Sequence, residues 1–294
     1  KIKIKKDCNM VWRIAINGFG RIGRNVLRAL LERKIMQLEV VAINNLGPIE
    51  HNAHLLRYDS VHGRLNEDVK VVGDRLEVGG QSIKVVSHAD PKNIPWKDLD
   101  VDIVLECTGK FTARDKAAWH LEAGAKRVLV SAPSEGADLT VVYGVNHQHI
   151  TSAHRVISNA SCTTNCLAPV VQVLHEAVGI VSGFMTTVHS YTGDQPTLDR
   201  MHTDLYRARA AALSMIPTST GAAKAVALVL PEFKDILDGV AIRVPTANVS
   251  VIDLNFIAKK STSVEEINSA IEKAAKGRLK NILAYTTEKL VSQD

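Results

Sequence analysis

The residue type and local setting best suited to covalent chemistry belong to Cys162, in the segment SCTTNC at 161–166. An apolar run ends at residue 160, and apolar residues recur at helical spacing from 167 to 178. This pattern predicts that Cys162 lies where a strand gives way to the N-terminus of a helix. Unpaired N–H groups and partial positive charge favour a thiolate there, and the thiolate is the reactive form of cysteine. The sequence therefore predicts that Cys162 is a nucleophile.

His189 is the candidate base for this nucleophile, near the end of a strand predicted over 183–192. A cysteine and a histidine form an activated pair when the fold brings them together, which their separation in sequence does not establish. A structural or surface histidine is the alternative. No metal site is predicted, because Cys162 and Cys166 stand on one presumed helix without a second pair of ligands.

Three further features could bind anions. Residues 193–217 lack alternation and are expected to form a long ordered loop, which inside a compact domain is usually functional. Thr220 and Gly221 open a predicted helix whose N-terminus could hold a phosphate or form an ordinary cap. Arg243 lies on an otherwise apolar strand predicted over 239–246, where its charge needs a glutamate or a substrate phosphate as partner. The loop also contains Arg200, Arg207 and Arg209.

The first half of the chain has the pattern of a dinucleotide-binding fold. A strand at 11–16 leads into Gly18, Gly20 and Gly23 in G-x-G-x-x-G spacing, followed by a helix at 24–31 and a strand at 38–44. Glycines allow the backbone to approach a pyrophosphate, and the helix N-terminus attracts it. Further strands at 101–109, 127–133 and 139–146, with a crossover helix at 113–124, predict a doubly wound parallel sheet.

The second strand of this unit ends in Asn44 and Asn45. An acid usually stands there in NAD-binding folds and bonds the adenosine ribose. An amide can also bond a hydroxyl, and it does not repel a 2′-phosphate. Asn45 therefore leaves NADP possible beside NAD, and the alternative is that Asn45 is only a turn residue.

Composition limits the remaining choices. The 294 residues are enough for about two domains, and no apolar run reaches membrane-spanning length. A net charge of +5 without a basic stripe interleaved with aromatics argues against nucleic acid and fits small anionic substrates. Four cysteines are few for this length, which suggests a reducing compartment, and no signal peptide is expected. Residues 1–9, which include Cys8, are set aside as an extension before Met10.

Together these motifs resemble the phosphorylating glyceraldehyde-3-phosphate dehydrogenase family, from about residue 11 onward. The matching stretches are NGFGRIG at 17–23, SCTTN at 161–165, His189 with Thr192, Thr220-Gly221, and RVPT at 243–246. The resemblance implies an α/β fold with a Rossmann domain at 11–160, built on a doubly wound parallel sheet, and an α+β catalytic domain with a mixed sheet at 161–294. It also implies a cytoplasmic homotetramer of glucose metabolism that uses NAD, and a chain that stops before the family's usual C-terminal segment.

The activity implied by the resemblance is oxidative phosphorylation of glyceraldehyde 3-phosphate to 1,3-bisphosphoglycerate, through a thiohemiacetal and a thioester on Cys162 with His189 as base. The residues implied to bind substrate and inorganic phosphate are Ser161, Thr163, Thr192, Arg207, Thr220, Gly221 and Arg243, with Arg209 as the alternative to Arg207. Those implied to bind the cofactor are Gly18, Gly20, Arg21, Ile22, Gly23, Asn45, Thr108 and Ser131.

The sequence alone leaves three alternative functions open. An erythrose-4-phosphate dehydrogenase would share the Cys–His pair but favour hydrolysis of the thioester. A cysteine acyl-transfer hydrolase would need no dinucleotide, which the glycine motif in its strand–turn–helix setting argues against. A catalytically impaired, truncated homologue with an interaction role is the third.

Overall fold

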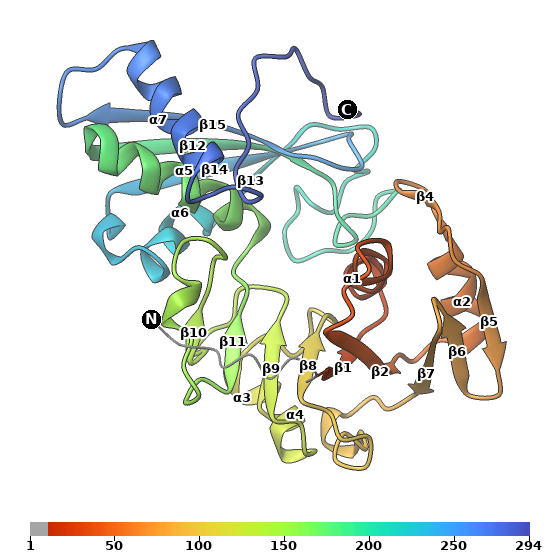
Figure 1. Cartoon of the computed structure of the whole chain (residues 1–294). Coiled ribbons are helices and arrows are strands. Elements are labelled where there is room, and N and C mark those ends of the chain that lie inside the picture. Colours follow the sequence, from red (N-terminus) through yellow and green to blue (C-terminus); the bar gives the residue numbers. More distant parts are fainter. Residues whose placement is uncertain (1–10) are drawn as a thin grey trace. The chain divides into compact units, whose positions relative to one another are not determined.

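The computed structural model describes residues 11–294, so the set-aside residues 1–9 lie outside the described part. The chain forms two compact units (Figure 1). The first contains the described residues up to Thr140 together with Ile150–Asn159, and the second contains Val141–His149 and Ala160–Asp294. The sequence-based boundary at residue 160 differs from this division at residues 141–149 and at Ala160, which belong to the second unit. Val142, Val145 and Ala160 pack in its core.

The first unit is built on a nine-stranded sheet in the order β10-β11-β9-β8-β1-β2-β7-β6-β5. Neighbouring strands are parallel from β10 to β7, which confirms the doubly wound arrangement, and β7, β6 and β5 are antiparallel. The strands are β1 Trp12–Asn17, β2 Leu38–Asn44, β5 Val69–Val72, β6 Arg75–Val78, β7 Gln81–Val86, β8 Ile103–Glu106, β9 Arg127–Val130, β10 Leu139–Thr140 and β11 Val156–Ser158. Strands β3 Tyr58–Asp59 and β4 Gly63–Arg64 form a separate hairpin.

The two faces of this sheet pack against different parts of the chain, as consecutive residues of β1 show. Ile16 packs with Leu27 and Leu30 of α1 (Arg21–Glu32), whereas Ala15 packs with Trp96 in a different cluster. Side chains alternate between the faces of a strand, so each face carries its own core. The other helical segments are α2 Ile49–Arg57, η1 Pro91–Asn93, α3 Arg114–Ala117 and α4 Trp119–Glu122.

Two predicted elements of the first half differ from the structure. The helix expected over 113–124 is divided at Ala118 into the short helices α3 and α4. The strand expected over 139–146 ends at Thr140, because the chain then closes on itself: the Asn146 side chain accepts the N–H of Val142, and Gly144 adopts φ +88°.

The second unit has a four-stranded mixed sheet in the order β13-β14-β12-β15, as predicted. Strands β12 (Ile180–Ser190) and β14 (Leu237–Val244) are parallel, and β15 (Val251–Ala258) and β13 (Ile216–Ser219) are antiparallel to their neighbours. Helices α5 (Cys162–Val178) and α7 (Val264–Lys276) lie side by side and share a small apolar cluster (Figure 1). Shorter helical segments are η2 His147–His149, α6 Ala222–Ala225, η3 Val226–Leu228 and η4 Pro231–Phe233.

Candidate active site

Cys162 is the first residue of α5, as the sequence predicts. Ser161 caps the helix, and its hydroxyl oxygen accepts the N–H of Thr164 at 3.0 Å. Serine is among the residues that best satisfy the free N–H groups of a helix start. The cap fixes where the helix begins and leaves the Cys162 side chain partly exposed at its positive end.

The hairpin-like connection from α5 to β12 brings His189 back to this end of the helix. Gly179 ends the helix with φ +72°, a conformation that favours glycine. The 17 residues of α5 rise about 25 Å and the 11 residues of β12 span about 35 Å, so the returning strand is long enough to reach the helix start. Nε2 of His189 lies 3.3 Å from Sγ of Cys162.

The hydrogen bonds of His189 define its ring orientation. The side chain is buried, and Nδ1 lies 2.7 Å from the carbonyl oxygen of Ser190. The Ser190 carbonyl can only accept, whereas Nη1 of Arg243, 2.8 Å from the same ring nitrogen, can only donate, so these two contacts require opposite protonation of Nδ1. In either tautomer Nε2 is the ring nitrogen that faces Cys162 and can exchange a proton with it. The same carbonyl also accepts from Nη1 of Arg243 at 2.8 Å.

The environment of Cys162 lowers the pKa of its thiol to about 7. The hydrogen bond with His189 is the largest cause, and the hydroxyl and N–H of Thr163 add to it. Burial acts in the opposite direction, and the nearby His189 charge supports the thiolate. About half of the Cys162 thiol is therefore ionised at neutral pH in this environment.

Arg243 is placed beside His189 by the register of the sheet. His189 and Arg243 are directly paired across the parallel strands β12 and β14, so their side chains stand on the same face. Nη1 of Arg243 lies 2.8 Å from Nδ1 of His189, and burial together with the charge of Arg207 lowers the arginine pKa. Its Nε is buried and has no hydrogen-bond partner among the described residues. This guanidinium therefore has one N–H that forms no hydrogen bond with the described residues.

The structure separates the two loop arginines that the sequence could not distinguish. Arg207 donates to the hydroxyl of Thr218 and to Asp194, and its charge reaches Arg243. Arg209 is exposed and pairs with Asp199 at 2.8 Å. The loop itself has no helix or strand between Ser190 and Ile216, as expected.

The two segments expected to bind phosphate meet at the start of α5. The hydroxyl of Thr164 donates to the carbonyl of Ala222 at 3.2 Å, which joins the Ser161–Thr163 turn to the Thr220–Gly221 turn. The helix that Thr220 and Gly221 open, α6, has four residues, and the Thr220 hydroxyl oxygen accepts the N–H of Ala222 within it. Thr192 is exposed on the loop, where its carbonyl accepts the N–H of Gln195.

A cavity of about 340 Å³ lies in the first unit, at the carboxyl ends of β1, β2 and β8. Its lining residues are Asn17, Gly18, Gly20, Asn44, Asn45, Leu46, His88, Ala89, Cys107, Thr108, Lys110 and Phe111. Ligands of doubly wound sheets bind at this edge. Four residues predicted for the cofactor, Gly18, Gly20, Asn45 and Thr108, are among them.

The glycine turn beside this cavity fits the pyrophosphate of a dinucleotide. Gly18 adopts φ +91°, and a Cβ there would lie 2.8 Å from Thr108, so the close approach of these two backbones requires glycine. Helix α1 starts after Gly20 without a side-chain cap, and no other atom lies within 4 Å of a Cβ placed on Gly20. The helix N–H groups are thus accessible to a pyrophosphate.

The other predicted cofactor residues do not line the cavity. Gly23 packs α1 against β1, since a Cβ there would lie 2.3 Å from the carbonyl oxygen of Gly18. Arg21 donates to Asp59 at 2.9 Å, and Ile22 is half exposed. Ser131 donates its hydroxyl to the carbonyl of Glu106 at 3.0 Å.

Asn45 bonds to its own unit through both ends of its amide. Its Nδ2 donates to Oδ1 of Asn52 at 2.8 Å, and its Oδ1 accepts the N–H of Phe19 at 3.4 Å. Asn45 therefore places an uncharged side chain at this position of the cavity wall.

Sequence reasoning missed several wall residues of this cavity: Leu46, His88, Ala89, Lys110 and Phe111. They lie in the connections that follow β2, β7 and β8. Position immediately after a predicted parallel strand was the signal that could have found those after β2 and β8, since these connections surround the binding edge.

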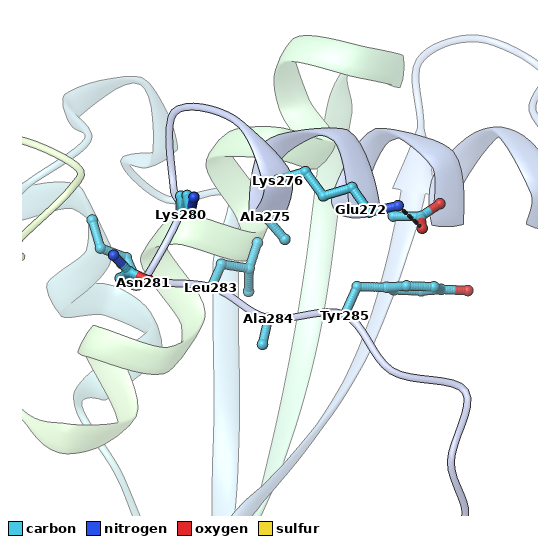
Figure 2. Close-up of a pocket in the computed structure, with 9 residues that line it drawn as sticks. Glu272, Ala275, Lys276, Lys280, Asn281, Leu283, Ala284 and Tyr285 are labelled. Carbon is cyan, nitrogen blue, oxygen red and sulfur yellow. Dashed lines mark hydrogen bonds and ion pairs between the residues drawn. The ribbon is translucent and has the colours of Figure 1, made fainter.

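A second cavity, of about 450 Å³, lies between the end of α7 and residues 280–285 (Figure 2). Its walls include the Lys276–Glu272 ion pair and Tyr285. None of the residues singled out from the sequence lines it. Its lining also contains no cysteine or histidine, so we do not assign it to the active site.

Among residues 11–294, no group of three or more histidine, cysteine or acidic side chains could hold a metal ion. None of the helices in that range is long and apolar enough to cross a membrane.

A doubly wound dinucleotide fold and an activated Cys–His pair define the class of protein as a cysteine-dependent oxidoreductase. Comparison with protein families agrees: residues 12–114 match the NAD binding domain of glyceraldehyde 3-phosphate dehydrogenase, and residues 161–294 match its C-terminal domain. The chain belongs to the glyceraldehyde-3-phosphate dehydrogenase family.

Curated relatives with this name share much of the sequence. The chain is 68% identical to the glyceraldehyde-3-phosphate dehydrogenase of Xanthobacter flavus over 96% of this chain and 84% of the relative. It is 65% identical to that of Cereibacter sphaeroides and 59% identical to that of Geobacillus stearothermophilus, in each case over 97% of this chain and 85% of the relative.

Proposed function

We propose that this chain oxidises glyceraldehyde 3-phosphate to 1,3-bisphosphoglycerate, with NAD as cofactor and inorganic phosphate as the second substrate. The observation that carries the proposal is the 3.3 Å approach of Cys162 Sγ to His189 Nε2, with Arg243 on the other side of the same imidazole. Family membership supplies the substrate. The first unit would be the dinucleotide-binding domain, and the second would carry the covalent chemistry.

The Cys162 thiolate attacks the aldehyde carbon, so that a C–S bond forms and the carbonyl oxygen takes up a proton to give a thiohemiacetal. His189 supplies that proton from Nε2 and removes the hydroxyl proton when the carbon is oxidised. When NAD is bound, its nicotinamide supplies the hydride acceptor. A phosphate oxygen then attacks the resulting thioester carbon, the C–S bond breaks, and the Cys162 thiolate is restored.

Two anions must be held during this sequence, the substrate phosphate and inorganic phosphate. Arg243 is proposed for the substrate phosphate together with Thr192, and Arg207 rather than Arg209 is proposed as the loop arginine, because its charge reaches Arg243. The remaining residues proposed to bind inorganic phosphate are Ser161, Thr163, Thr220 and Gly221. Holding both reactants in place lowers the entropic part of the barrier by several kcal/mol.

NAD is the proposed cofactor, bound along Gly18, Gly20, Arg21, Ile22, Gly23, Asn45, Thr108 and Ser131. The uncharged Asn45 does not repel a 2′-phosphate, so we also expect measurable activity with NADP. A cytoplasmic homotetramer is proposed from the family. It is supported by large apolar side chains left exposed on the second sheet, namely Val181, Phe184, Val240, Val251 and Ile257.

The test is reduction of NAD or NADP by purified protein with glyceraldehyde 3-phosphate, with and without phosphate, followed by the absorbance of the reduced nicotinamide. We expect continuous turnover that requires phosphate. Cys162→Ser should bind dinucleotide and lose turnover, whereas Cys166→Ser should retain it, because burial raises the pKa of that thiol. Phosphate-independent turnover would indicate thioester hydrolysis and refute the proposal, as would activity in Cys162→Ser.

A further inference from the structure

A buried polar cluster in the first unit is not used by the mechanism above. It consists of Glu106, His120, Asn17, Trp96 and Thr108, and all but Thr108 are almost fully buried. Glu106 is the last residue of β8, and Asn17 is its register partner at the end of β1. Both therefore stand at the carboxyl edge of the sheet, directly behind the dinucleotide cavity that Asn17 and Thr108 line.

The hydrogen bonds fix the proton on His120. Trp96 Nε1–H donates to Nδ1 of His120 at 2.9 Å, and an indole nitrogen can only donate. Nδ1 is therefore unprotonated, so Nε2 carries the hydrogen and donates to Oε2 of Glu106 at 2.9 Å. His120 is thus neutral and acts as a donor to the carboxylate rather than as a cation.

Glu106 accepts from four donors in total. Besides His120, the side-chain amide of Asn17 donates to Oε2 at 2.6 Å, and the N–H of Thr108 donates to Oε1 at 2.7 Å. The hydroxyl of Thr108 also donates to Oε1. No lysine or arginine forms an ion pair with Glu106 in the described part of the chain. Every neighbour is a donor, so the site suits an ionised carboxylate, whose burial is compensated by four charge-assisted bonds.

We propose that Glu106 is a positioning residue for the dinucleotide: it holds Thr108 and Asn17 in the geometry that shapes the cavity floor. Thr108 is fixed through two bonds to one carboxylate oxygen, and the backbone of Gly18 packs directly on it. Glu106 therefore locks the turn after β8 against the glycine turn after β1. This inference rests on the proposed use of a dinucleotide, and it adds a residue that touches no part of the ligand.

A carboxylate suits this role better than its amide. In Glu106→Gln, the new NH₂ group would face donors, either those of Thr108 or those of Asn17 and His120. One side of the cluster would then lose its acceptor, although size and shape are nearly unchanged. The structure thus provides a variant that disturbs the position of the floor without removing a cavity residue.

The test compares Glu106→Gln with native protein and with Glu77→Gln, an exposed carboxylate on β6 of the same sheet. NAD affinity is measured by titration well below the unfolding temperature of each protein. We expect Glu106→Gln to bind NAD about tenfold or more weakly and Glu77→Gln to bind within twofold of native. The rate of Cys162 alkylation, a property of the second unit, should be unchanged in both.

A second pair of variants, at residues outside the cavity lining, keeps the test open if Glu106→Gln fails to fold. Trp96→Phe removes the N–H that holds His120 in the tautomer that donates to Glu106, whereas Trp12→Phe changes an exposed tryptophan of the same unit. We expect weaker NAD binding in the first and near-native binding in the second. Native-like affinity in Glu106→Gln or in Trp96→Phe overturns the positioning role. Failure of native protein to bind NAD would instead refute the proposed function, so the two failures are distinguishable.

Discussion

Replacing His189 with alanine tests the central electrostatic argument, because the hydrogen bond from His189 is the largest cause of the low Cys162 pKa. Without it, the pKa should rise from about 7 toward the ordinary thiol value of 9.0 or above, since burial remains. The thiolate fraction at neutral pH then falls from about one half to about one in a hundred. A more basic thiolate is intrinsically more nucleophilic, by about six- to tenfold over two pKa units. Alkylation at neutral pH should therefore slow by about fivefold to tenfold.

The assay is the rate of iodoacetamide alkylation as a function of pH, in Cys166→Ser protein so that one exposed thiol of α5 is followed. We expect the midpoint of the profile near pH 7 with His189 present and about two units higher in His189→Ala. His149→Ala is the matched control, because His149 is exposed in the same unit. An unchanged midpoint in His189→Ala, or an equal shift in His149→Ala, refutes the reasoning.

Two further predictions concern charge. Arg207→Ala should raise KM for the anionic substrates about tenfold or more, because a charge-assisted bond is lost, whereas Arg209→Ala should stay within twofold; equal effects in steady-state assays would contradict the assignment. Burial raises the pKa of Asp59, but two backbone N–H groups and Arg21 outweigh burial and lower it to about 2. Asp59→Asn should therefore destabilise the protein by about 2 kcal/mol above pH 4, and this difference should disappear as pH falls through about 2; a pH-independent difference in thermal unfolding would contradict it.

Local pattern was sufficient for much of the fold. The glycine spacing, the apolar strand before it and the helical spacing after it predicted β1, α1 and β2 because each signal acts within a few residues. Prediction was weaker where a side chain redirects the backbone. The strand expected over 139–146 stops because Asn146 captures the N–H of Val142, and apolar periodicity contains no information about that bond.

The residues of the candidate site also differ in whether the local sequence could predict them. The position of Cys162 at a helix start follows from its neighbours, and its setting could be predicted. Glu106 could not be recognised, because an acid at the end of an apolar strand is equally consistent with an exposed edge. Its four donors come from the ends of β1 and β8 and from α4, so its role depends on tertiary contacts.

Tertiary contacts also explain why Arg243 and His189 lie together in the candidate site. Their separation in sequence predicts no contact, and a shift of one residue in the β12–β14 pairing would place Arg243 on the opposite face of the sheet from His189. With the observed register, Arg243 bonds the Ser190 carbonyl that also orients the imidazole. An anion that draws Arg243 away from this carbonyl would change the surroundings of His189 as well. Under the proposed function, binding of the substrate phosphate would be linked to the proton transfer at Cys162 through the contacts of Arg243 with the Ser190 carbonyl and His189.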